Sequence, residues 1–111
     1  MKIPNNSQSF VADNKITGYL LSETHETGKH KAAFFTRFGF NVADIGTLKG
    51  SLIQHSIDRD IEKTQDTIYG VKYVLRCEIK TPDERNPCIE TVWLVEHGQK
   101  EPKLITAYAV K

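Results

Sequence analysis

The feature that most constrains this chain is the strand-like alternation of residues 71–80. Apolar side chains occupy every second position from Val71 to Ile79, and polar side chains occupy most positions between them. A period of two places successive side chains on opposite faces of a strand, so one face is expected to be buried. Before residue 60 the apolar residues recur at helical spacing instead. Helices followed by strands predict an α+β domain.

Three helices are expected in the first half of the chain. The first starts near residue 14 and is short. The second runs from about Lys29 to Phe38, where Gly39 can adopt the left-handed conformation that ends a helix. The third begins after Asn41, whose side chain can cap it. We expect these helices to pack on one face of the sheet.

Strands are expected at 61–69, 71–80, 89–96 and 103–110, separated by turns that contain Pro or Gly. The predicted fold is two or three N-terminal helices packed on one face of a three- to four-stranded antiparallel meander. It forms a single domain with an N-terminal arm (1–13), a helical part (14–58) and a sheet (61–110). The first strand is polar and is expected to be an exposed edge, where a second copy of the chain could pair.

Composition and charge narrow the function classes. A chain of 111 residues fits one domain, and 39% hydrophobic with 26% charged residues is typical of a soluble globular protein. The net charge of +1 gives no global preference for nucleic acid, so any basic footprint must be local. No apolar run is long enough to span a membrane, and the first residues lack the apolar segment of a signal peptide. We therefore expect a cytoplasmic protein that does not contact membranes.

The two cysteines are expected to be reduced thiols. Centring the turn between Pro82 and Pro87 places Cys77 opposite about residue 92, which is too far from Cys88 for a disulfide. The four histidines and two cysteines do not have the spacing of zinc ligands. We expect neither a metal nor another cofactor.

Three adjacent basic residues, Lys29, His30 and Lys31, stand at the start of the second helix. A helix N-terminus carries partial positive charge and free N–H groups, so it favours a bound anion over a lysine. Helical spacing directs Lys31 toward the aromatic, buried side and His30 toward its boundary. An anion pocket is the functional interpretation. The structural alternative is an ion pair of Lys31 with Glu78 or Glu90.

The strand pairing predicts a second basic surface, on the helix-free face of the sheet. Arg76 is expected near Trp93, Trp93 near Thr106, and Thr91 near Tyr108. Arg and Lys suit phosphate contacts, while Trp and Tyr suit base stacking. A slip of one residue would exchange the two faces, and the alternative is an ordinary solvated surface. Lys31 points toward the helical side of this sheet, so a combined site must lie at the rim, or one of its elements is misplaced.

Four motifs occur in order along the chain: His25-x-x-Gly28-x-His30-Lys31-Ala32-x-Phe34-Phe35-x-x-x-Gly39-Phe40, Tyr69-Gly70-x-Lys72-Tyr73, Thr91-Val92-Trp93-x-Val95 and Pro102-x-Leu104-x-Thr106-Ala107-Tyr108. They resemble an uncharacterised bacterial domain family that occurs alone and as the C-terminal module of polymorphic toxins and phage-related proteins. That family is similar to the barnase–EndoU–colicin–RelE group of metal-independent ribonucleases. The resemblance implies an RNA-cleaving toxin, an endoribonuclease, that acts on RNA and is encoded beside a small antitoxin.

Metal-independent RNA cleavage needs a base, an acid and cations for the phosphorane. The candidate catalytic residues are His30, Lys31, His25, Thr106 and Tyr108, and the candidate substrate-binding residues are Gly28, Lys72, Arg76, Thr91 and Trp93. His55 is expected to be a partly exposed surface residue. Two other functions stay open: a non-catalytic protein- or nucleic-acid-binding module, and an enzyme acting on a phosphorylated small molecule.

Overall fold

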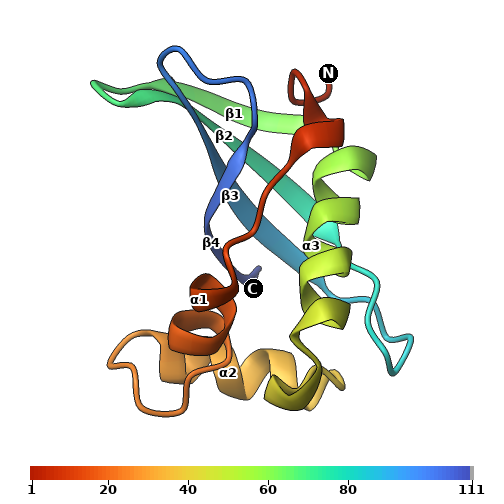
Figure 1. The fold of residues 1–111 in the computed structure, drawn as a ribbon. Coiled ribbons are helices and arrows are strands. Elements are labelled where there is room, and N and C mark those ends of the chain that lie inside the picture. The colour runs from red at the N-terminus through yellow and green to blue at the C-terminus, as the bar shows by residue number, and fades with distance from the viewer. Residues whose placement is uncertain (111) are drawn as a thin grey trace.

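The computed structural model of the chain describes residues 1–110, in which the helices precede the strands (Figure 1). The helical elements are η1 (Asn6–Gln8), α1 (Asp13–Lys15), its π-helical continuation η2 (Ile16–Leu20), α2 (Gly28–Arg37), η3 (Val42–Asp44) and α3 (Ile45–Asp58). The strands are β1 (Ile61–Asp66), β2 (Gly70–Glu78), β3 (Cys88–Glu96) and β4 (Lys103–Ala109). The predicted α+β fold is confirmed.

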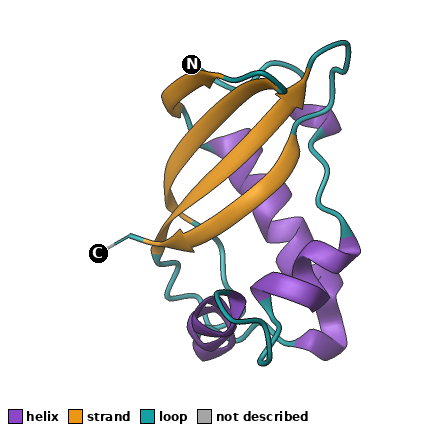
Figure 2. Ribbon diagram, turned by 90° about the vertical axis from the view of Figure 1, so that its left-hand side faces the viewer, coloured by secondary structure: helices purple, strands orange, loops and turns teal. Residues whose placement is uncertain are grey.

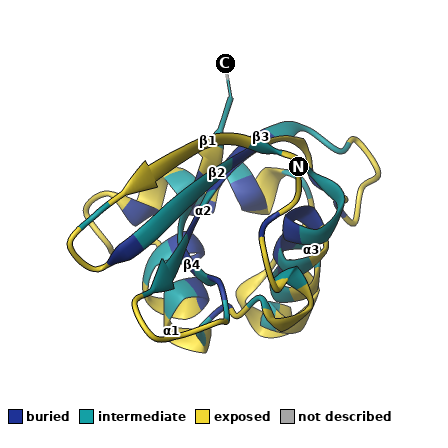
Figure 3. Cartoon of the chain, turned by 90° about the horizontal axis from the view of Figure 1, so that it is seen from above, coloured by how far each residue is buried: buried dark blue, intermediate teal, exposed yellow. Residues whose placement is uncertain are grey.

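The strands form one antiparallel sheet in the order β1-β2-β3-β4, so β1 and β4 are its edges. The helices lie on one side of this sheet (Figure 2). Seen from above, the sheet arches over α2 and α3, and its other face carries no helix (Figure 3). Within residues 1–110, no helix is both long enough and apolar enough to cross a membrane.

The core fills the space between the helices and the sheet. Sheet residues such as Leu75 and Trp93 meet helical residues such as Phe35, Leu48 and Leu52 in a single apolar cluster. Its largest fully buried side chains are Trp93, Phe35, Phe40, Ile16, Leu20, Leu48, Leu52, Leu75, Ile79, Ile89, Val11 and Thr91. Burial of this set is the main favourable contribution to folding.

The N-terminal segment, predicted to be an arm, packs against the rest of the domain. Phe10 forms an isolated parallel bridge with Lys103, the first residue of β4. The Met1 carbonyl accepts a hydrogen bond from the N–H of Ile61 (2.7 Å), at the other edge of the sheet. The side chains of Ile3 and Val11 are buried. The segment therefore crosses the molecule and contacts both edge strands.

The local signals that end α2 behave as expected. Gly39 has φ = +101°, and the N–H of Phe40 donates to the carbonyl of Phe35 (3.2 Å). The Asn41 side chain accepts a hydrogen bond from the N–H of Ala43 (2.6 Å), which starts the next helical segment. These caps depend on neighbouring residues alone, and their prediction is confirmed.

The pairing of β2 with β3 differs by three residues from the prediction. Arg76 lies opposite Glu90 rather than Trp93, and Cys77 lies opposite Ile89. Because three is odd, the shift exchanges the two faces of β3. Trp93, predicted on the helix-free surface, is completely buried under the helices.

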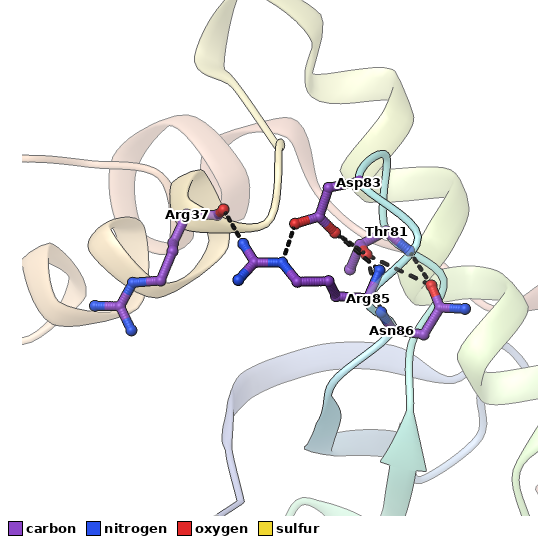
Figure 4. A network of polar contacts seen from close by, with 5 residues as sticks. All are labelled: Arg37, Thr81, Asp83, Arg85 and Asn86. Atoms are coloured by element: carbon purple, nitrogen blue, oxygen red, sulfur yellow. Dashed lines mark hydrogen bonds and ion pairs between the residues drawn. The ribbon is translucent and has the colours of Figure 1, made fainter.

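The loop between β2 and β3 explains this shift. Glu84 and Asn86 both have left-handed backbone conformations, so the loop is not symmetric about its prolines. The Asn86 side chain accepts a hydrogen bond from the Thr81 N–H (2.9 Å). The Arg85 guanidinium binds the carbonyl of Arg37 at the end of α2 (2.7 Å), as Figure 4 shows. Side-chain hydrogen bonds and attachment to α2 shape this loop.

The pairing of β3 with β4 also departs from the prediction. Tyr108 lies opposite Glu90, whereas its predicted partner was the next residue, Thr91. Farther along the strands Trp93 lies opposite Leu104 instead of Thr106, because β4 contains a bulge after Leu104. Of the residues predicted on the helix-free surface, Thr91 and Trp93 of β3 therefore face the helices. Thr106 and Tyr108 of β4 remain on the predicted face.

Candidate functional site

Side chains from η2, the loop that follows it, α2 and β4 meet at the outer edge of the sheet, along β4. The ammonium nitrogen of Lys31 lies 5.7 Å from the ring centroid of Tyr19 and 5.0 Å from that of Tyr108. The His25 ring stands edge-on to Tyr19, with 4.9 Å between centroids. The hydroxyl oxygens of Tyr19 and Thr106 are 3.2 Å apart. We call these five residues the β4-edge cluster.

Gly28 allows the helical parts of this cluster to approach each other. A Cβ atom at residue 28 would lie 2.2 Å from the carbonyl oxygen of Tyr19, so no larger residue fits without displacement. Gly28 is the first residue of α2, and Lys31 lies three residues later, about one turn along the helix. The close contact between η2 and the start of α2 thus brings Lys31 against Tyr19.

His25 caps α2 with its imidazole ring. The Nδ1 atom accepts hydrogen bonds from the backbone N–H groups of Thr27 (3.1 Å) and Gly28 (2.9 Å). A ring nitrogen that accepts two N–H groups carries no proton, so this geometry assigns the proton of neutral His25 to Nε2. His25 can therefore donate a hydrogen bond through Nε2, but a proton on Nδ1 would break the cap.

The same contacts correct the prediction of an anion site made of backbone N–H groups at this helix start. Besides the two N–H groups bound by the ring, the N–H of Lys29 donates to the backbone carbonyl of His25 (2.9 Å). The N–H groups of residues 27–29 are thus occupied within the chain. These three N–H groups are therefore not free to bind an anion.

Lys31 carries the positive charge among the five cluster residues, and the ammonium nitrogen of Lys15 lies beside them, 5.5 Å from the ring centroid of Tyr19. Lys31 is half-buried, and within residues 1–110 no carboxylate forms an ion pair with it. Glu90, a carboxylate considered as its partner, pairs with Arg76 instead (2.9 Å). Two tyrosine rings face the ammonium group, an arrangement that stabilises a cation without neutralising it.

The other cationic candidates lie outside the cluster. His30 is exposed on the first turn of α2, and in the described part of the chain its side chain forms no hydrogen bond. Lys72 lies on the helix-free face, opposite Leu94. Arg76 is on that face too, but its charge is balanced by Glu90. Of the predicted cations, only Lys31 belongs to the cluster. His30 is the residue before Lys31 in the chain.

Thr91 and Trp93, predicted to bind substrate, belong instead to a buried hydrogen-bond chain. Trp93 Nε1 donates to Thr91 Oγ1 (2.9 Å), which lies 3.1 Å from His55 Nδ1. His55 Nε2 lies 3.0 Å from the carbonyl oxygen of Cys77. Since a carbonyl only accepts, Nε2 carries the proton and the Thr91 hydroxyl donates to Nδ1.

The His55 side chain is therefore not the surface residue that was predicted. Its exposed fraction is 2%, and burial lowers its pKa from 6.5 to about 4. The hydrogen-bond chain joins α3 to β2 and β3. Its role is structural, and no sequence signal identified it because it depends on the strand pairing.

The β4-edge cluster is suited to a phosphate ester beside an aromatic base. It combines the unneutralised ammonium group of Lys31, hydroxyl and imidazole donors, and the partly exposed ring of Tyr108. Among the described residues, no group of three or more His, Cys, Asp or Glu side chains is arranged to hold a metal ion.

Comparisons with known proteins place the fold. A family model described as Domain of unknown function (DUF6883) matches residues 2–111. A search of curated proteins found no match. A chain of the contact-dependent growth inhibition toxin–immunity protein complex from Klebsiella pneumoniae 342 has a similar structure, with a TM-score of 0.73 and 18% sequence identity. The alignment covers 96% of this chain and 97% of that chain, and at this identity it shows a shared fold.

Proposed function

We propose that this chain, which belongs to the DUF6883 family, is a toxin-type endoribonuclease that cleaves RNA at the β4-edge cluster without a metal. The observation that carries the proposal is the ammonium group of Lys31, held between two tyrosine rings with no carboxylate partner in residues 1–110. A cation held this way is available to a phosphate, which in RNA is the reacting group. The fold shared with a chain of a toxin–immunity complex supports the association with toxins.

The hydrogen bonds of His25 limit the part it can take in catalysis. A neutral imidazole that gave up its Nε2 proton would become an anion, and protonation at Nδ1 would cost the cap of α2. His25 therefore acts as a hydrogen-bond donor to a phosphate oxygen and does not transfer a proton. Proton transfer falls to the neighbouring basic groups.

We assign those transfers to His30 and Lys31. The exposed imidazole of His30 is the base that removes the proton of the 2′-hydroxyl, because histidine exchanges protons near neutral pH. Lys31 stabilises the charge on the phosphorane and donates a proton to the leaving oxygen. Tyr108 offers its ring to a base, while the contact between Tyr19 and Thr106 holds the edge strand against η2.

Induced expression in bacteria tests this function. The wild-type chain is expected to arrest growth and to fragment cellular RNA, whereas Lys31→Met should do neither. Lys29→Met is the matched control, because it removes the same charge from an exposed position on the same helix. Harmless expression of the wild type with intact RNA, or equal rescue by both substitutions, would contradict the proposal.

A pair of substitutions at His25 separates capping from catalysis. Asn places an acceptor near the position of Nδ1 but lacks Nε2–H, so His25→Asn should fold normally and cleave RNA roughly 100-fold more slowly. His25→Ala should in addition lose about 1 kcal/mol of stability. Full activity in the Asn variant would restrict His25 to its capping role.

A non-catalytic binding module is the second candidate, favoured by the tip of the β1–β2 hairpin. Ile68 and Tyr69 are 84% and 68% exposed there, which is unusual for adjacent apolar side chains. If binding at this tip is the function, Ile68→Ser with Tyr69→Ser should abolish the effect on growth, and Lys31→Met should leave it intact. The opposite pattern is expected for a ribonuclease.

A further inference from the structure

Two thiols lie together at one end of the β2–β3 hairpin. Cys77 is near the end of β2 and Cys88 is the first residue of β3. Their sulfur atoms are 2.7 Å apart, with the Cys88 thiol donating to the Cys77 sulfur. The register shift described above accounts for this proximity, which corrects the prediction that the two residues are too far apart to react.

The backbone at Cys77 is distorted in the direction that brings the thiols together. Cys77 lies opposite Ile89, whereas Cys88 lies opposite Glu78, so in regular strands the two cysteines would point to opposite faces. Cys77 has φ = 133°, a conformation that is unfavourable for any residue except glycine. Its side chain is exposed, although alternation with the buried Leu75 predicts the core face.

The surroundings of the two sulfurs define their order of reaction. Burial, together with the hydrogen bond to Cys77, raises the pKa of Cys88 to about 11, so Cys88 keeps its proton. Cys77 is exposed to solvent and accepts that hydrogen bond, whereas Cys88 is only partly exposed. Cys77 is therefore the sulfur that meets an external reagent first, and Cys88 is the one that follows.

We propose that Cys77 and Cys88 form a modification site for thiol–disulfide exchange with small disulfides such as oxidised glutathione. The Cys77 thiolate attacks one sulfur of oxidised glutathione, which forms a mixed disulfide and releases one glutathione. Cys88 then loses its proton and attacks the Cys77 sulfur, which releases the second glutathione. The protein loses two electrons and two protons, and the reagent is reduced to two thiols.

The resulting disulfide closes the loop of residues 78–87 with a covalent bond. That loop is attached to α2 through Arg85, and the Cys77 carbonyl accepts the hydrogen bond of His55 from α3. Oxidation thus fixes the end of the hairpin to which α2 and α3 are hydrogen-bonded. This site uses no residue of the β4-edge cluster, so it stands independently of the proposed ribonuclease activity.

Mass spectrometry of the intact purified chain tests the site. After incubation with oxidised glutathione and then iodoacetamide, the wild type should have lost two hydrogens, carry no glutathione and resist alkylation. Cys88→Ser should stop at a mixed disulfide with one glutathione on Cys77. Cys77→Ser should react at least about tenfold more slowly, because the remaining thiol is protonated and partly covered.

Two outcomes would overturn the proposal. One is a wild-type protein that accumulates stable mixed disulfides, and the other is a wild-type protein that is alkylated at both positions after oxidation. Circular dichroism of both serine variants checks that they fold. If either does not, the wild-type masses alone still decide between an intramolecular disulfide and none.

Discussion

Acidification should destabilise the protein through His55. The ring is neutral in the folded chain, donating to the Cys77 carbonyl and accepting from the Thr91 hydroxyl. A second ring proton would turn the Thr91 hydroxyl proton away from Nδ1, and burial, followed by the nearby charge of Arg59, opposes that proton. The folded chain thus resists a proton that the unfolded chain accepts at the ordinary pKa of histidine.

The size of the effect follows from the two pKa values. A decrease from 6.5 to about 4 corresponds to about 3 kcal/mol of unfolding free energy. Because the folded-state pKa is lowered, this stability is present in full above 6.5 and is lost as the pH falls toward 4. At pH 5 about 2 kcal/mol should already be lost relative to pH 7.

Urea denaturation of the wild type and of His55→Gln across this pH range measures the effect. Glutamine does not titrate, and its amide can still donate to the Cys77 carbonyl. The variant should be less stable at pH 7, and the difference between the two proteins should shrink by about 2 kcal/mol at pH 5. The titration of carboxylates affects the stability of both proteins equally, so it cancels in the difference between them. Parallel pH profiles would refute the assignment of this loss to His55.

Three other substitutions test the packing. Gly28→Ala should cost more than about 2 kcal/mol, because its Cβ would meet the Tyr19 carbonyl, whereas Gly50→Ala on open α3 surface should be neutral or stabilising; thermal unfolding compares them. Thr91→Val should cost about 2 kcal/mol in urea denaturation, since it leaves the buried Trp and His partners unpaired. Arg85→Ala should change stability by less than about 1 kcal/mol. It should nevertheless speed proteolysis of the β2–β3 loop, which Arg85 attaches to α2.

The parts of the fold that depend on neighbouring residues were predictable. The left-handed Gly39 and the backbone hydrogen bond from Phe40 to Phe35 need only the adjacent turn of α2. The alternation in β2 likewise identified Leu75 as buried. These features follow from local sequence because the same few residues contain both the signal and the structure.

The strand register was not predictable, because distant residues determine it. The β2–β3 loop is held by Arg85 against the end of α2, a contact across 48 positions of sequence. The resulting error of three residues in the predicted pairing placed Trp93 on the surface instead of in the core. It also placed Cys77 too far from Cys88. One misplaced turn thus produced the wrong sheet face and the wrong cysteine prediction together.

The candidate site was predicted in part. Lys31 and Tyr108 were chosen from opposite halves of the chain, and they meet at the rim, which was one of the two arrangements considered. Tyr19 was missed, since a tyrosine on an apolar helical stripe gives no sign that it will face a lysine. His25 was chosen as a catalytic residue, and its ring nitrogen caps α2, a task more often performed by Ser, Thr, Asn or Asp.

The rate of RNA cleavage by purified protein, with a chelator present, tests the central claim most directly. The wild type and Lys29→Met should cleave at rates within about twofold of each other, because Lys29 is exposed and outside the cluster. Lys31→Met should be slower by roughly 100-fold or more. Equal rates for the two substitutions, or no cleavage by the folded wild-type protein, would contradict the assignment of catalysis to the β4-edge cluster.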